Sequence, residues 1–250
     1  MKKISIILVF IIGFIQYAGA SATKEEADKA YQENNFKDAI EKYEQILETE
    51  GESADIYYNL GNSYYKDKNM AKAVLNYERA LLLDPGNSDA RFNLELARGK
   101  TVDQIVPMRE IFIISWIKSI ANCMSERGWG IMGIVSFLVL LGSLMLYIFG
   151  KRLVLKKIGF IAAVLCLIVT VSSNLFANSQ KDRLQIRSGA IIMAPSITIK
   201  STPDETGTDL FVLHEGTKVY IEDNTMKEWK EIRLEDGKKG WIQTKNIEVI

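Results

Sequence analysis

Two long apolar runs joined by a short basic segment constrain this chain more than any other feature of its sequence. The runs cover residues 129–149 and 158–177, and neither contains a charged residue. A helix rises about 1.5 Å per residue, so about 20 residues cross a hydrocarbon core about 30 Å thick. The connecting residues 150–157 are so few that the two runs must form an antiparallel hairpin, and four of these eight residues are cationic. Because cationic loops stay in the cytoplasm, the pattern predicts transmembrane helices at 129–149 and 158–177 with a cytoplasmic loop at 150–157.

The hairpin also decides where the rest of the chain lies. With its loop inside, the regions before and after it both lie on the periplasmic side of an inner membrane. Lys2 and Lys3, an apolar run at 4–15 and Ala18-Gly19-Ala20 predict a signal peptide at residues 1–20, which agrees with export. The alternative, a buried hairpin within a large soluble protein, is disfavoured by two uncharged runs with a basic turn.

Residues 23–100 repeat with a period of 34 residues. The equivalent pairs are Phe36 and Met70, Ala39 and Ala73, Tyr43 and Tyr77, and Leu47 and Leu81. A helix–turn–helix unit of this length resembles the tetratricopeptide repeat. The second unit fits that family's pattern at Tyr57, Leu60, Gly61, Tyr64, Ala73, Tyr77, Ala80 and Pro85.

The first unit departs from the pattern, because Thr23 stands in the place of Tyr57 and Gly51 in the place of Pro85. We expect its first helix to be short or frayed. Residues 88–97 begin a third unit that has no second helix, and such a terminal helix covers the last apolar face of a repeat array. The sequence therefore predicts an all-α repeat domain at 21–100, made of two repeats and a capping helix.

The resemblance implies a concave groove, lined by the first helices, that binds a peptide. The residues expected to line this groove include Asp28. The candidate partner-binding residues among them are Tyr31, Tyr58, Asn59, Asn62, Tyr65 and Asn93. Tyrosine offers flat apolar area, and the asparagine amide bonds a peptide backbone. The family's basic carboxylate clamp is absent where it is expected, because Asp89 and Asn93 occupy its positions. The alternative is an array that only spaces or supports its neighbours.

Residues 101–128 predict a linker, broken by Pro107, and an interfacial amphipathic helix. Apolar residues recur at helical spacing around Trp116, just ahead of the first apolar run. Such a helix lies along a bilayer surface. The sequence leaves open that it packs on the repeat array instead.

Residues 185–250 predict a small all-β domain, because short alternating runs are separated by turn residues. The segments 199–203, 213–219, 229–232 and 236–242 resemble those of bacterial SH3-like domains, which implies a small barrel. Bacterial members of this family meet cell-wall peptides or other proteins. We expect Trp229 and Trp241 to pack in the core or rim rather than to form a ligand platform.

Chemistry-bearing residues are few. The apolar runs hold no acid, base or histidine, which disfavours an ion or proton path. We expect Cys123 and Cys166 to be small buried hydrophobes without a disulfide, and His214 is the only histidine. No metal site, cofactor-binding motif or catalytic set is recognisable, so the sequence predicts a protein that is not an enzyme and needs no cofactor. Residues 21–100 carry 11 Lys/Arg against 16 Asp/Glu, which disfavours nucleic acid as a partner.

The whole domain order resembles the BatE-like proteins of the Bacteroides aerotolerance operon. This resemblance implies a scaffold in the inner membrane that works with membrane proteins carrying von Willebrand A domains, in aerotolerance or envelope stress. A cell-wall sensor that binds peptidoglycan through residues 185–250 is the alternative. Partner identity and stoichiometry stay open at this point.

Overall fold

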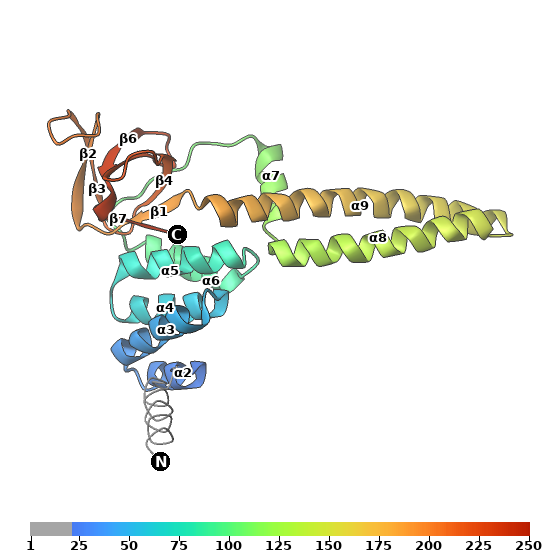
Figure 1. Cartoon of the computed structure of the whole chain (residues 1–250), viewed down its shortest axis with the longest axis horizontal. Coiled ribbons are helices and arrows are strands. Elements are labelled where there is room, and N and C mark those ends of the chain that lie inside the picture. The colour runs from blue at the N-terminus through green and yellow to red at the C-terminus, as the bar shows by residue number, and fades with distance from the viewer. Residues whose placement is uncertain (1–21) are drawn as a thin grey trace, which may run out of the picture.

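The computed structural model describes residues 22–250, so the predicted signal peptide at 1–20 lies outside the described residues. A helical array, a long helical hairpin and an antiparallel sheet follow one another along the chain (Figure 1). The array and the sheet lie together at one end of the hairpin, and the turn of the hairpin lies at the far end.

The array has the predicted helix–turn–helix order. Its helices are α2 (Lys24–Gln32), α3 (Phe36–Glu50), α4 (Ala54–Lys66), α5 (Met70–Leu83) and α6 (Ser88–Arg98). Thr23 begins α2 with a capping box to Glu26, and α2 has 9 residues against 13 in α4, so the short first helix is confirmed. Asn34 and Lys68, which are one repeat apart, both adopt a left-handed backbone with φ of 61° and 69°. The same turn therefore joins the two helices of each unit.

Small residues let the helices of the second unit approach closely, as the repeat pattern predicts. Ala73 is fully buried, and a Cβ added to Gly61 would lie 2.8 Å from the ring of Tyr77. Tyr77 itself is 1% exposed. The ring of Tyr77 thus occupies the space that the missing side chain of Gly61 leaves.

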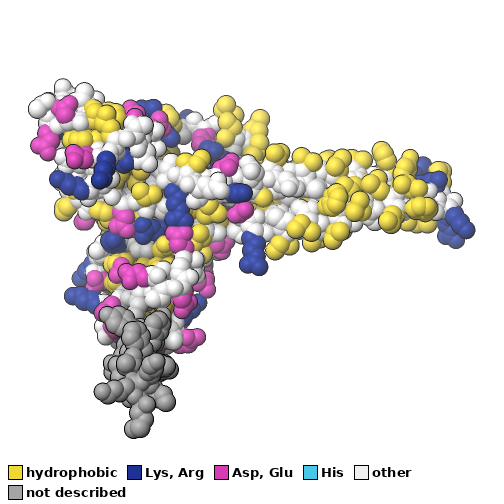
Figure 2. Space-filling model, viewed as in Figure 1, with side chains coloured by type: hydrophobic (Ala, Val, Ile, Leu, Met, Phe, Trp, Pro, Cys, Tyr) yellow, Lys and Arg dark blue, Asp and Glu magenta, His cyan; other side chains and the backbone are white. Residues whose placement is uncertain are grey.

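The two apolar runs form α8 (Glu126–Phe149) and α9 (Leu153–Ile186), which pack against each other along their lengths. Hydrophobic side chains cover their visible surface (Figure 2). Both helices could span a membrane by length and composition. A Cβ at Gly159 would lie 2.8 Å from the carbonyl oxygen of Ser143, so the helices nearly touch there.

The hairpin differs from the prediction at both ends of α9. Only residues 150–152 form the turn, because the helix already begins at Leu153, and residues 178–186 continue the helix beyond the predicted end of the apolar run at residue 177. The polar end of α9 stays helical because it is bonded to α7 (Phe112–Ala121). The amide of Gln180 donates to the carbonyl oxygen of Ala121 over 2.8 Å.

The predicted amphipathic helix is α7, and it crosses the hairpin near the end that meets the two domains (Figure 1). The indole of Trp129 also donates to the carbonyl oxygen of Ala121, over 2.9 Å. Cys123 follows α7 and is exposed, so the expectation that it is a buried hydrophobe is wrong. It lies beyond the last turn of the helix, where no element covers it among the described residues. Cys166 is half-buried on α9, and both thiols are free.

The C-terminal region is an antiparallel sheet. Its strands are β1 (Gly189–Ile192), β2 (Ser196–Lys200), β3 (Asp209–His214), β4 (Lys218–Asp223), β5 (Trp229–Arg233), β6 (Lys239–Gln243) and β7 (Ile247–Val249). Their order is β3-β2-β6-β5-β4-β1-β7, with β3 and β7 at opposite edges. The sheet is therefore open in the described residues, and the closed SH3-like barrel stays a prediction. Trp229 and Trp241 are half-buried.

The sheet packs directly on the helical array. Ile191 of β1 and Ile250, which follows β7, belong to the same buried cluster as Val74 and Leu75 of α5. Glu248 accepts hydrogen bonds from Lys72 over 2.7 Å and from Arg79 over 3.2 Å. The helical array and the sheet thus share a core and ion pairs.

Candidate partner-binding groove

A groove of about 290 Å³ opens on the helical array where the repeat pattern predicts it. Its lining residues are Tyr31, Tyr58, Asn62, Tyr65, Lys66, Tyr77, Asn93 and Leu96. Of the residues predicted for the groove, Asp28 and Asn59 are not among them, and all of the others are. The first helices α2, α4 and α6 supply every lining residue except Tyr77, which comes from α5.

The 34-residue period explains how the tyrosines come together. Tyr31 and Tyr65 occupy the same place in successive units, and Tyr58 lies two turns before Tyr65 on α4. All three side chains are half-buried and pack against the core of the array. Their rings therefore present apolar area to the groove while the helices hold them in place.

A network of polar side chains fixes the floor of the groove. The amide oxygen of Asn62 accepts a 2.7 Å hydrogen bond from the hydroxyl of Tyr77 and a 2.9 Å hydrogen bond from the amide of Asn93. The amide of Asn93 also lies 3.3 Å from the hydroxyl oxygen of Tyr58. Burial raises the pKa of Tyr77, so its hydroxyl stays a neutral donor. The Asn62 amide nitrogen has no partner among residues 22–250 and can donate to a backbone carbonyl oxygen.

Asn59 and Asp28, both predicted for the groove, bond to each other within the array. Asn59 does not line the groove, because its amide donates to the carboxylate of Asp28 over 3.3 Å. The same carboxylate oxygen accepts a 2.5 Å hydrogen bond from the hydroxyl of Tyr43. Asp28 and Asn59 therefore tie α2, α3 and α4 together, and their polar groups are already engaged.

Lys66 and Leu96 also line the groove, and the sequence reasoning missed them. Lys66 lines the groove, and the ammonium of Lys100, one repeat further on, lies 4.2 Å from the centre of the Tyr65 ring. Phe92 is 61% exposed and Leu96 is 45% exposed on α6. The 34-residue shift that pairs Tyr31 with Tyr65 also pairs Lys66 with Lys100, so the same period could have found them.

This arrangement can hold an extended peptide segment. Aromatic faces and Leu96 offer apolar contact, Asn62 offers a free amide donor, and Lys66 offers positive charge. Between residues 22 and 250 no group of three or more His, Cys, Asp or Glu side chains is placed to hold a metal ion. His214 lies outside the groove, where its ring Nδ1 is 2.9 Å from a carboxylate oxygen of Asp103.

Comparisons with known proteins find similarity in the helical array. The tetratricopeptide repeat family profile matches residues 24–90. Sperm-associated antigen 1 of Rattus norvegicus is 36% identical over 77 residues, which is 31% of this chain and 9% of that protein. Sperm-associated antigen 1 of Mus musculus is also 36% identical over 77 residues, or 8% of its length. The chain thus spans less than a tenth of the length of these relatives, and the likeness shows that a tetratricopeptide repeat is present.

Proposed function

We propose that this protein is a membrane-anchored scaffold whose repeat groove binds an extended segment of a protein partner. The observation that carries the proposal is the groove itself. It combines half-buried tyrosine rings, the free amide donor of Asn62 and the exposed side chain of Leu96 on one surface. These groups recognise a peptide and provide no catalytic chemistry, so we also propose that the protein is not an enzyme.

Three observations support membrane anchoring. The helices α8 and α9 have the length and apolar composition of membrane spans. The helix α7, with Trp116 59% exposed, crosses the hairpin at the level where the apolar run of α9 gives way to Gln180. The array and the sheet lie at the end of the hairpin opposite the cationic turn, so one membrane face holds both. We place that face in the periplasm.

The resemblance to BatE-like proteins extends the proposal to partners. It suggests membrane proteins with von Willebrand A domains and a role in aerotolerance or envelope stress. The sheet at residues 189–249 would then correspond to the SH3-like domain of that family, with an open strand order.

Site-specific photo-crosslinking of the whole chain in native membranes tests the groove. A photo-crosslinking residue at Leu96 should trap one discrete partner, which mass spectrometry identifies, whereas the same residue at exposed Gln45 on α3 should not. Tyr65→Ala should then weaken the captured partner by at least about 2 kcal/mol, or about 30-fold in Kd. Tyr65→Phe is the matched control, because it keeps the ring. Equal crosslinking at Leu96 and Gln45 would contradict the proposal.

Cell-wall binding is the second candidate function. It is favoured by Trp229 and Trp241, which are half-buried on neighbouring strands of the sheet and leave part of each ring accessible. The test is co-sedimentation of the detergent-solubilised whole chain with purified peptidoglycan, because Ile191 and Ile250 pack against the helical array. Retention that Trp241→Ala abolishes and Tyr65→Ala leaves unchanged would favour this function over the scaffold.

A further inference from the structure

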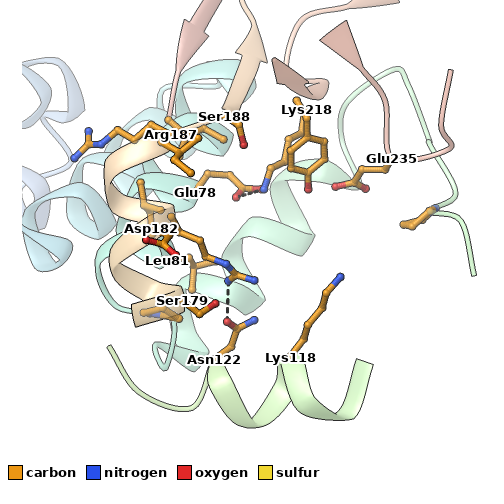
Figure 3. Close-up of a pocket in the computed structure, with 18 of the residues that line it drawn as sticks. Glu78, Leu81, Lys118, Asn122, Ser179, Asp182, Arg187, Ser188, Lys218 and Glu235 are labelled. Atoms are coloured by element: carbon orange, nitrogen blue, oxygen red, sulfur yellow. Dashed lines mark hydrogen bonds and ion pairs between the residues drawn. The ribbon is translucent and has the colours of Figure 1, made fainter. Parts of the chain in front are cut away.

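A second and larger hollow lies where the array, the sheet and the base of the hairpin meet. This cleft has a volume of about 1080 Å³ and is lined by residues of α5, α6, α7, α9 and β4. Figure 3 shows Lys118 of α7 and Asn122, which follows this helix, on one side, Glu78 and Lys218 on the other, and Ser179 and Asp182 of α9 between them. The proposed groove on α2, α4 and α6 shares none of these residues.

The lining of the cleft is rich in positive charge. Eight arginine or lysine side chains line it, against four aspartate or glutamate side chains. Most of the cations are neutralised by ion pairs, such as Lys118 with Glu110 and Lys218 with Glu78. Arg91, Arg109 and Arg183 have no carboxylate partner among residues 22–250. Among residues 22–250, one lining carboxylate has no cationic partner, that of Asp182, which accepts a hydrogen bond from the amide of Asn178.

The position of the cleft relative to α7 identifies the ligand class. The amide oxygen of Asn122 accepts a 2.9 Å hydrogen bond from Arg183, so the end of α7 lies beside this arginine on α9. Phe112, Ile113 and Trp116 of α7 are all more than half exposed. If α7 lies in the membrane interface, as the proposed function requires, the floor of the cleft lies at the depth of the lipid headgroups.

We infer that this cleft binds the phosphate headgroup of an anionic phospholipid from the surrounding leaflet. Guanidinium groups suit phosphate because their fork of donors matches its oxygens. Leu175 and Ile186 also line the cleft and offer apolar surface to the upper part of the acyl chains. The inference rests on the membrane anchoring in the proposed function. It adds a lipid site, separate from the groove, that would fix the exported part against the bilayer.

Native mass spectrometry of the detergent-solubilised whole chain tests the site. Phosphatidylglycerol should bind at least about tenfold more tightly than phosphatidylcholine with the same acyl chains. The triple variant Arg91→Gln, Arg109→Gln, Arg183→Gln should abolish this preference, since each cation near a membrane surface contributes about fivefold. The control variant Lys37→Gln, Lys227→Gln, Lys245→Gln removes the same charge from exposed lysines outside the cleft and should keep the preference.

A second variant tests the site by an expected gain in lipid binding rather than a loss. Asp182→Asn removes the one lining carboxylate that has no cationic partner, so phosphatidylglycerol should bind about fivefold more tightly. Equal binding of both lipids by the native chain would overturn the inference. An equal loss of the phosphatidylglycerol preference in the two triple variants would also overturn it. The same holds if glycerol phosphate binds as tightly as the lipid. Release of the native chain from membranes by alkaline carbonate would instead contradict the anchoring itself.

Discussion

The carboxylate of Glu78 on α5 accepts a 2.6 Å hydrogen bond from the ammonium of Lys218 on β4, although 140 residues separate them in the chain (Figure 3). Arg98 of α6 donates to the other carboxylate oxygen, also over 2.6 Å. Burial would raise the pKa of Glu78, but the charges of Lys218 and Arg98 outweigh it and hold that pKa below its usual value. The carboxylate therefore stays ionised and joins the sheet to the helical array.

We expect Glu78→Gln to destabilise the protein by about 3 kcal/mol, because it removes a buried carboxylate and leaves two half-buried cations without their main counter-charge. Urea denaturation of the detergent-solubilised chain, followed by tryptophan fluorescence, measures this change. Glu222→Gln is a matched control. Glu222 also pairs with two cations, Arg233 over 2.6 Å and Lys239 over 2.7 Å, but its side chain is 30% exposed against 8% for Glu78. The control should cost less than about 1 kcal/mol. Equal costs would show that burial of the Glu78 cluster is unimportant.

Asp103 links the segment after α6 to the sheet through hydrogen bonds. We expect these bonds to make the free energy of unfolding decrease at acidic pH. Its carboxylate accepts hydrogen bonds from the backbone N–H of His214 and from the hydroxyl of Thr217, both over 2.7 Å. Burial raises the pKa of Asp103, but the bonds from His214 and Thr217 lower it more, so it lies below the usual 3.8. Because its pKa is lower in the folded state than in the unfolded state, Asp103 stabilises the fold at pH values above its pKa in the unfolded state. That stabilisation is lost as the pH falls below about 3.8 through the folded pKa.

Asp103→Asn should remove this part of the acid dependence. We expect the variant to lose about 1–3 kcal/mol at neutral pH, the usual effect of losing charged hydrogen bonds. As the pH falls from about 3.8 through the lower pKa of the folded state, its stability should approach that of the native chain, because Asp103 is protonated in both states of the native chain only below that folded pKa. Urea midpoints measured from pH 3 to pH 7 report both effects. A constant difference across this range would assign the stabilisation to another group.

Periodicity made the helical array predictable from the sequence. The 34-residue repeat placed Gly61 against the second helix and brought Tyr31, Tyr58 and Tyr65 to one groove, because helix packing repeats whenever the sequence does. Asn59 does not line the groove because its side chain turns to a neighbour within the array, here Asp28. The repeat pattern fixes the position of a Cα atom but not the partner of an amide.

The contacts between the array and the sheet were not predictable in the same way. Glu78 reads as one more polar residue on an amphipathic helix, and Lys218 as one more on a strand. Nothing local marks them as partners, since the pairing arises from how two separate elements dock. The cleft between them depends on the same docking, and its cations are scattered from Arg91 to Arg233. The helical extension of α9 to Ile186 likewise depends on the bond from Gln180 to α7.

Gly61→Ala should destabilise the array by about 1–3 kcal/mol, because the new Cβ would lie 2.8 Å from two ring atoms of Tyr77. The ring has little freedom to move, since it is buried and its hydroxyl bonds Asn62. Gly99→Ala at the end of α6 is the control, because its nearest contact would be an ordinary 3.4 Å. Thermal melting of the two variants should therefore separate them. If both melt at the native temperature, the contact between α4 and α5 is looser than described.

The orientation of the hairpin can be read from one native thiol. Cys123 is exposed at the base of the hairpin, beside Gly86 of the helical array, whereas Cys166 lies within α9. If the cationic turn is cytoplasmic, a membrane-impermeant maleimide added to intact spheroplasts should label Cys123, and Cys123→Ser should abolish the labelling. Arg152→Cys in the Cys123→Ser background places the thiol in the turn, so it should react only after the membrane is opened. The reverse pattern would invert the topology, and labelling of both thiols in intact spheroplasts would show that the hairpin does not cross the membrane.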